Sequence, residues 1–186
     1  MRFAKLAIFG FALMLQPAFA QDTTPSTQEI VDALLPTGLD GRKIKGARSL
    51  DGLLGGNSTG RGVKVIQGKE VPFIDLRVAF EYDSDRLSND AMLTLKNLGE
   101  ALGDEAFKNS RFRIVGHTDA RGSEDYNYQL SQRRAQAVTR YLAANYAISP
   151  DRIEVGAKGK TELLADIAPE DERNRRVEVQ NITAAD

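Results

Sequence analysis

The sequence predicts an α+β fold, a two-layer sandwich with the order β-α-β-α-β-β and with its helices on one face of a small mixed sheet. Two observations lead to this prediction. From residue 71 onward, short segments rich in β-forming residues alternate with two helical patterns. Each helical pattern carries its apolar residues along one side, so each helix has one face to bury against a sheet.

The compact part of the chain opens with a strand and a helix. Residues 73–82 are rich in β-forming side chains and are predicted to form a strand. Apolar residues then recur at the spacing of one helical face, at Ala91, Leu95, Leu98 and Leu102. Gly103 follows directly and can end that helix.

The second half of the domain repeats this alternation. A strand predicted at 111–115 leads into a polar, glycine-containing loop at 116–123. A long helix follows at 124–146. Two further strands are predicted at 152–155 and 175–180. Because helices separate the earlier strands, we expect those helices to cross over one face of the sheet.

The first twenty residues have the order of features that is typical of a secretory signal peptide. Two early cations precede an unbroken apolar run at 6–15, and an Ala-x-Ala sequence ends at Ala20. The run is about half the length of a membrane span, which needs about twenty residues. We therefore expect residues 1–20 to be cleaved before Gln21 and the protein to be exported.

Residues 21–70 differ from the rest of the chain in composition. Nine of the sixteen glycines fall between Gly38 and Gly68, and this stretch contains no aromatic residue. A segment with so few large apolar side chains cannot bury enough surface to offset the entropy of ordering its backbone. The composition therefore predicts a flexible leader.

Two short elements stand out within this predicted leader. Residues 27–35 carry apolar side chains at helical spacing, and Pro36 ends the run. Such a helix fits two roles, docking onto another protein or packing weakly on its own domain. Residues 61–67 contain alternating valines and are predicted to form a short strand.

Composition excludes several classes of function. The chain has no cysteine, so it has no disulfide, no cysteine-linked lipid anchor and no cysteine-containing zinc site. A single histidine argues against other zinc sites, and the net charge of −1 argues against a nucleic-acid partner. Residues 156–160 lack the glycine spacing of a phosphate loop. Together with the cysteine and histidine counts, this predicts neither a metal nor a cofactor.

One arginine of the long helix lies on its apolar side. On a helical wheel the apolar stripe contains Leu130, Val138, Tyr141 and Leu142. Arg134 falls in the middle of this stripe together with Asn127, whereas Arg133 points roughly the other way. An arginine on the core side is unfavourable unless it is paired, and its planar fork suits a carboxylate.

Asp119, at the end of a predicted strand, is the candidate partner for this arginine. Two interpretations fit the pair. The first is a structural salt bridge between Asp119 and Arg134. The second is a pocket in which the acid binds the ammonium of a zwitterion and the arginine binds its carboxylate. The start of the helix near Ser123 would add backbone donors to such a pocket.

Spaced motifs run through residues 71–182 in a fixed order, and together they leave 183–186 as a tail. The principal motifs are Gly116-His117-Thr118-Asp119, Tyr126-Asn127, Leu130-Ser131, Arg134-Ala135 and Asn174-Arg175-Arg176-Val177-Glu178. The series resembles the OmpA-like peptidoglycan-binding domain family. Many matches in the right order are more specific than any one short motif.

The resemblance implies non-covalent binding to the diaminopimelate of peptidoglycan stem peptides. The family positions that line the pocket match Thr118, Asp119, Asn127, Leu130 and Arg134. Arg175 or Arg176 matches a basic position near the rim. Diaminopimelate ends in a free amino-acid centre, which is the zwitterion that the proposed pair of charges would suit.

We therefore expect a non-enzymatic tether in the Gram-negative envelope, located in the periplasm or at the outer membrane. One alternative is an envelope scaffold, in which residues 27–35 recruit another protein. The other is a peptidoglycan hydrolase, which needs two carboxylates at a fixed separation, drawn from Glu124, Asp125 and Glu162. The first two acids begin a helix, where acids commonly interact with the helix dipole.

Overall fold

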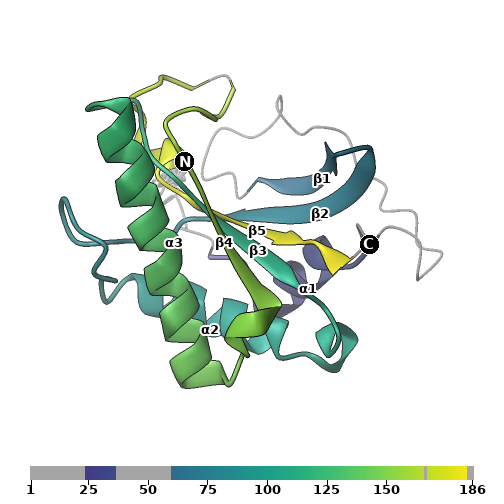
Figure 1. Ribbon diagram of the computed structural model, residues 1–186. Helices are drawn as coiled ribbons and strands as arrows, with labels where there is room; N and C mark the ends of the chain where they lie inside the picture. The colour runs from purple at the N-terminus through teal and green to yellow at the C-terminus, as the bar shows by residue number, and fades with distance from the viewer. Residues whose placement is uncertain (1–23, 37–59, 166, 184–186) are drawn as a thin grey trace, which may run out of the picture.

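The computed structural model describes residues 24–36, 60–165 and 167–183. The predicted signal peptide at 1–20 lies outside these residues, as do much of the predicted leader and the end of the tail. Figure 1 shows the sheet with its helices packed against it. No helix in these three ranges is long and apolar enough to cross a membrane.

The described strands form one mixed sheet in the order β1-β2-β5-β3-β4. Their bounds are Arg61–Ile66 for β1, Lys69–Leu76 for β2, Phe112–His117 for β3, Ile153–Gly159 for β4 and Val177–Asn181 for β5. β3 and β4 run parallel, and the other neighbours are antiparallel. A helix joins β3 to β4, because parallel strands need a long crossover. The predicted small mixed sheet is confirmed.

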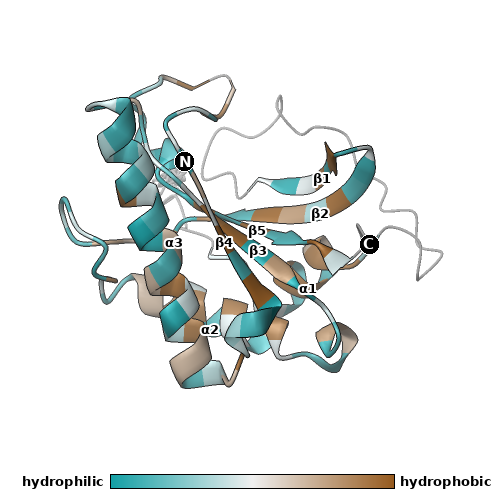
Figure 2. Cartoon of the chain, in the orientation of Figure 1, coloured by the Kyte–Doolittle hydropathy of each residue, from teal (hydrophilic) through white to brown (hydrophobic). Residues whose placement is uncertain are grey.

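The helices α1 (Thr27–Leu34), α2 (Ala91–Leu102) and α3 (Glu124–Tyr146) share one apolar core with the sheet. The strands contribute Ile74, Leu76, Ile114, Ile153, Val177 and Val179 to this core. Because all three helices pack on the same cluster, they lie on one face of the sheet, as predicted. Figure 2 shows that the first turns of α3 are mostly hydrophilic, whereas its later turns carry more apolar residues.

The short helix α1 belongs to this core. Ser26 caps its N-terminus in a capping box with Glu29. Ile30 and Leu34 are fully buried, and the Leu34 carbonyl accepts a hydrogen bond of 2.9 Å from Asn181 Nδ2 on β5. Of the two roles that residues 27–35 fit, packing on its own domain is the one observed.

The first strand also lies ahead of the predicted domain start at residue 71. All of β1 pairs with β2, and Gln67 and Gly68 form a turn with positive φ angles between them. The strand predicted at 61–67 is therefore confirmed, and it belongs to the same sheet as the strands after residue 71. The composition of this segment predicted a flexible leader because an edge strand, like a leader, needs few large apolar side chains.

The strand predicted at 73–82 is shifted in the structure. β2 ends at Leu76, which pairs with Val177, the first residue of β5. Beyond this pair neither neighbouring strand offers another backbone partner, so the chain leaves the sheet. Phe80 forms an isolated bridge with Leu87, and the loop between them reaches α3.

The face of the sheet away from the helices carries a buried charged network. Asp75 and Glu178 lie directly opposite each other on β2 and β5. Asp75 Oδ1 lies 3.1 Å from Arg176 Nε, and Lys64 pairs with Glu178. The His117 Nε2 atom lies 3.8 Å from Glu178 Oε2, and His117 is only 2% exposed.

Burial moves two pKa values of this network in opposite directions. Burial lowers the pKa of His117 from 6.5 to about 3, and the cations Arg176 and Lys64 act in the same direction. Burial raises the pKa of Asp75 from 3.8 to about 6, although Arg176 opposes that shift. His117 therefore contributes stability above pH 6.5 that is lost in acid. Asp75 contributes stability in acid that is lost as pH rises through about 6.

The variant His117→Gln is expected to lose less stability in mild acid than the wild type. Between pH 7 and 5 the unfolded wild type takes up a proton that the folded protein excludes, which lowers the free energy of unfolding by about 2 kcal/mol. Urea unfolding across this range measures the difference. The control Asp75→Asn should change in the opposite direction and lose about 1 kcal/mol relative to the wild type. Parallel pH curves for His117→Gln and the wild type would contradict the prediction.

Candidate ligand-binding site at the end of β3

The loop that joins β3 to α3 brings polar side chains to one end of the sheet. Thr118 and Asp119 directly follow β3, and both are buried. Gly122 has a φ of 86°, a left-handed conformation that suits glycine and lets the chain turn into α3. Ser123 caps the helix by accepting a hydrogen bond of 3.3 Å from the Tyr126 amide.

Close backbone contact holds α3 over this strand end. A Cβ added at Gly116 would lie 2.1 Å from the Ser131 carbonyl oxygen, so only glycine fits between strand and helix. Ser131 Oγ also accepts a hydrogen bond of 3.0 Å from the Gly159 amide of β4. Both contacts involve Ser131, which precedes Arg134 by three residues on α3. They therefore fix the distance of the Arg134 side chain from the sheet.

The Asp119 carboxylate is held by basic residues on both sides. Its Oδ1 accepts a hydrogen bond of 3.1 Å from the Arg121 amide. Its Oδ2 accepts one of 2.8 Å from Arg175 Nη1 and one of 3.3 Å from Arg121 Nη1. These bonds use three of about four acceptor positions of a carboxylate. One position therefore remains for a further donor, such as a ligand ammonium.

Arg134 is 8% exposed and is anchored through one edge of its guanidinium. Its Nε donates to the Ser84 carbonyl at 3.0 Å, and its Cζ lies 4.9 Å from the centre of the Phe80 ring. Burial lowers the pKa of Arg134, as does the nearby Arg175 cation. Among the described residues its terminal nitrogens have no hydrogen-bond partner, so the fork is available to a carboxylate.

The other predicted pocket residues on the loop and helix are also buried. Asn127 Nδ2 donates to the Arg121 carbonyl at 2.6 Å and so closes the loop around Asp119. Leu130 is buried one turn before Arg134. Thr118 Oγ1 is buried without a hydrogen-bond partner in the described part of the chain. Such an orphaned hydroxyl suits a bound water or ligand.

Asp119 and Arg134 do not form a direct ion pair in the described residues, so the structural salt bridge between them is not observed. The Asp119 charge opposes the lowering of the Arg134 pKa. Within the described residues, each of the two groups keeps hydrogen-bonding capacity.

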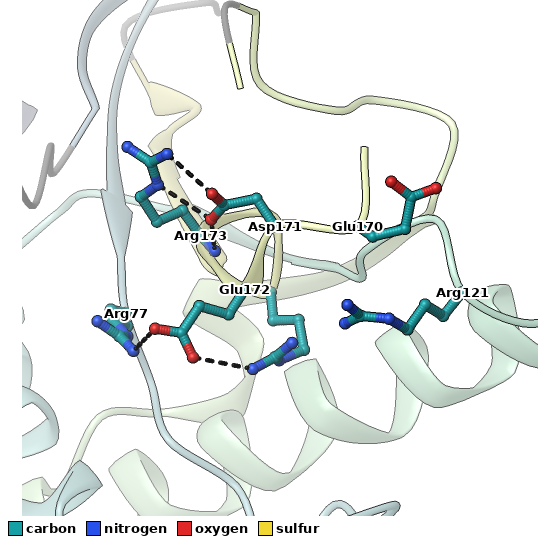
Figure 3. A pocket seen from close by; sticks show the side chains of 7 residues that line it. Arg77, Arg121, Glu170, Asp171, Glu172 and Arg173 are labelled. Atoms are coloured by element: carbon teal, nitrogen blue, oxygen red, sulfur yellow. Dashed lines mark hydrogen bonds and ion pairs between the residues drawn. The ribbon is translucent and has the colours of Figure 1, made fainter. Parts of the chain in front are cut away.

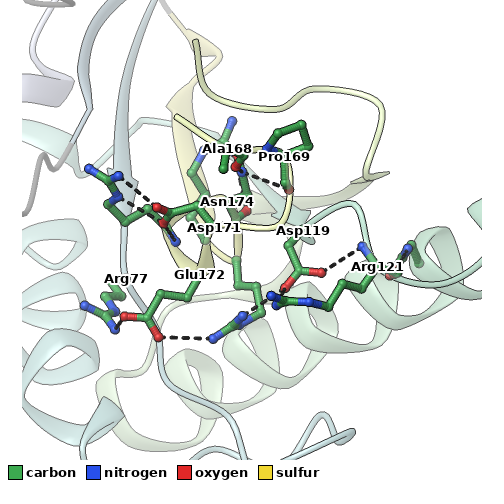
Figure 4. Close-up of polar contacts among 12 residues, drawn as sticks. Arg77, Asp119, Arg121, Ala168, Pro169, Asp171, Glu172 and Asn174 are labelled. Carbon is green, nitrogen blue, oxygen red and sulfur yellow. Dashed lines mark hydrogen bonds and ion pairs between the residues drawn. The ribbon is translucent and has the colours of Figure 1, made fainter. Parts of the chain in front are cut away.

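The two arginines of the Asn174-Arg175-Arg176 motif point to opposite sides. Arg175 bonds to Asp119, as Figure 4 shows for that carboxylate and its neighbours. Arg176 belongs to the buried network with Asp75 on the other face of the sheet. Of the two rim candidates, the structure brings only Arg175 to the site. Asn174 anchors this loop, because its side chain bonds to backbone groups of Leu164, Ala168 and Pro169.

Ser84 and Phe80 contact Arg134, although neither was predicted as a site residue. Ser84 acts through its backbone carbonyl, which any residue would supply. Phe80 belongs to a predicted strand but lies under Arg134 because the chain leaves the sheet after Leu76. The loop containing Ser84 is also held by the Tyr126 hydroxyl, which donates to the Asp83 carboxylate.

The acids considered for hydrolysis have other surroundings. Glu124 and Asp125 are exposed in the first turn of α3. Glu162 pairs with Lys64 and Lys158. Within the described ranges, no cluster of three or more acidic or histidine side chains could hold a metal ion.

The sequence profile of the OmpA family matches residues 79–176, more than half of the chain and nearly all of this site. The chain belongs to the OmpA family. The match contains both halves of the pocket, from Phe80 and Ser84 through Asp119 and Arg134 to Arg175.

Curated relatives of this OmpA-family chain are envelope proteins by name. It is 32% identical to outer membrane porin F of Pseudomonas aeruginosa over 60% of its own length and 32% of the porin. It is 41% identical to the peptidoglycan-associated lipoprotein of the same organism, over 54% of its length and 59% of the lipoprotein. The chain thus spans less than two thirds of these relatives.

Solved structures of OmpA-like domains resemble the fold. The OmpA-like domain of FopA1 from Francisella tularensis has a TM-score of 0.50 at 25% identity, over 64% of this chain and 77% of that one. The cell wall anchor of the type VI secretion system (T6SS) of Pseudomonas aeruginosa has a TM-score of 0.50 at 25% identity, over 65% and 86%. The predicted α+β fold is therefore confirmed.

Proposed function

We propose that this protein binds peptidoglycan without cleaving it and that its ligand is the diaminopimelate of stem peptides. The observation that carries the proposal is the buried Arg134, whose terminal nitrogens have no hydrogen-bond partner among the described residues. A buried arginine with an unfilled fork calls for a carboxylate ligand. The names of two relatives, a peptidoglycan-associated lipoprotein and a cell wall anchor, support the same polymer.

The free end of diaminopimelate matches the two charges of the site. Its carboxylate would accept hydrogen bonds from the terminal nitrogens of Arg134, and its ammonium would donate to the open position on Asp119. The buried Thr118 hydroxyl offers a further partner, and Leu130 would pack against the aliphatic part of the ligand. Arg175 and Arg121 keep Asp119 in place for this contact.

A pure scaffold role for residues 27–35 has less support than wall binding. Ile30, Val31 and Leu34 are buried in the core of the protein's own domain, so these side chains are not offered to a partner. In the proposed role the protein works in the envelope, in the periplasm or at the outer membrane. Export would follow from the signal peptide predicted at 1–20, and the names of the relatives fit this location.

Co-sedimentation of the purified protein with insoluble peptidoglycan tests the proposal. The protein should pellet with the sacculi and should be released by free meso-diaminopimelate. Cadaverine is the matched control ligand, because it keeps both ammonium groups of diaminopimelate but lacks both carboxylates, and it should release much less. Soluble muropeptides should not accumulate, whereas a hydrolase would produce them. Protein that stays in the supernatant, or equal release by cadaverine, would refute the proposal.

A further inference from the structure

A cavity is lined in part by the two arginines that bond to Asp119. It has a volume of about 560 Å³ and is lined by Arg77, Arg121, Glu170, Asp171, Glu172, Arg173 and Arg175. Figure 3 shows these charged side chains converging from the end of β2, the loop after β3 and the loop before β5. Four arginines and three acids give the lining a net positive charge.

The cavity shares two residues with the surroundings of Asp119. Arg121 and Arg175 line the cavity, and both also bond to Asp119 (Figure 4). A ligand whose ammonium reached Asp119 would therefore extend past these two arginines. A group that is covalently attached to that ligand would then lie in the cavity.

The ion pairs of the cavity differ in how readily they can open. Arg173 is held firmly, because Asp171 accepts from its backbone amide at 2.8 Å and from its Nε and Nη2 at 3.0 and 2.8 Å. Among the described residues, the Arg77 side chain makes one ion pair, of 2.6 Å to Glu172, and the two side chains are 50% and 55% exposed. Exposed pairs of this kind contribute little to stability, so a ligand carboxylate can compete for Arg77 at small cost.

Glu172 also bonds to Arg175, at 3.3 Å from Nη2. Arg77 can therefore bind a new carboxylate while Glu172 stays paired with Arg175. Arg77 lies just after β2 and is separate from Asp119 and Arg134, so it offers a positive group at the far end of the cavity from them.

We infer that this arginine-lined cavity binds a second, free carboxylate of the same stem peptide, with Arg77 as its principal contact. The inference rests on the proposed function. In a stem peptide the residue before diaminopimelate is a glutamate joined through its side chain, so its α-carboxylate stays ionised. Arg77 thus makes the protein prefer an acidic stem peptide over one in which that carboxylate is amidated.

Isothermal titration with two synthetic tripeptides tests the inference. Both have the sequence L-Ala-γ-D-Glu-meso-diaminopimelate, and in one of them the glutamyl α-carboxylate is a carboxamide. The wild type should bind the acid about three- to tenfold more tightly than the amide, as one exposed charge-assisted bond allows. Arg77→Gln should remove this preference and leave the affinity for free diaminopimelate unchanged.

Arg111→Gln is the matched control variant. Arg111 has the same exposed fraction of 50% and also contacts a single acid, Glu154, but it lies at the other end of β3. It should keep the preference for the acid.

The outcomes separate this inference from the proposed function. If the wild type binds neither free diaminopimelate nor the tripeptides, the proposed function itself fails. If it binds diaminopimelate but binds acid and amide equally, the cavity is no carboxylate site and only the inference fails. If Arg77→Gln weakens free diaminopimelate as much as the tripeptide, Arg77 acts by positioning Arg175 through Glu172, which also overturns the inference.

Discussion

Replacing Arg134 with glutamine is expected to reduce the affinity for peptidoglycan by about thirtyfold or more. Removing one partner of a buried, hydrogen-bonded charge pair costs about 2 to 5 kcal/mol of binding free energy, and about 1.4 kcal/mol is a factor of ten. The glutamine cannot supply the planar fork that the proposed carboxylate requires. It also loses the contacts of Arg134 with Ser84 and Phe80. Asp119→Asn should have a comparable effect, because it removes the negative charge that would attract the ammonium.

Co-sedimentation with sacculi over a range of protein concentrations measures this loss, and circular dichroism checks that each variant is folded. Arg133→Gln is the control, since Arg133 is the neighbouring residue on α3 and its side chain is exposed. It should pellet like the wild type. A folded Arg134→Gln protein that pellets equally well would show that Arg134 is structural.

Gly116→Ala is expected to lower the free energy of unfolding by about 3 kcal/mol or more. Its methyl group would lie 2.1 Å from the Ser131 oxygen and 2.8 Å from the Ser131 carbonyl carbon. These are backbone atoms in the middle of α3, so no side chain can rotate away and the helix must move off β3. A displaced α3 would also misplace Arg134, so binding to sacculi should fall together with stability.

Urea unfolding compares this variant with Gly62→Ala. A methyl group at Gly62 would lie 3.4 Å from the Phe73 ring, an ordinary contact on the edge strand β1. This control should change the free energy of unfolding by less than about 0.5 kcal/mol. Equal stability of the two variants would mean that α3 can shift without cost, contrary to the close packing observed.

The long helix was predictable from its residues alone. Its observed bounds, Glu124–Tyr146, agree with the prediction, and the buried positions of Arg134 and Asn127 follow from the wheel. The prediction succeeds because a helix has 3.6 residues per turn, so the position of each residue in the sequence fixes the direction of its side chain. The helical face from Ala91 to Leu102 was predictable in the same way, and all four of its apolar residues are buried.

Features that depend on neighbours in space were predicted less well. The end of β2 is set by where β5 begins, and the inclusion of β1 is set by its pairing with β2. The role of α1 depended on whether its apolar side met the core or a partner, and sequence periodicity is the same in both cases. The sequence left open whether Arg175 or Arg176 lies near Asp119. Only the alternation of side chains along β5, and the path of the chain leading into it, decided that Arg175 does.

By itself the sequence determined the fold class, the two amphipathic helices, the family motifs and the position of Arg134 on the core side of α3. These features lie in local periodicity and composition. The tertiary structure alone decided that Asp119 bonds to Arg175 and Arg121, that Arg134 rests on Ser84 and Phe80, and that an arginine-lined cavity adjoins them. Those contacts join residues from separate elements, and only the packing of α3 on the strand ends through Gly116 brings them together.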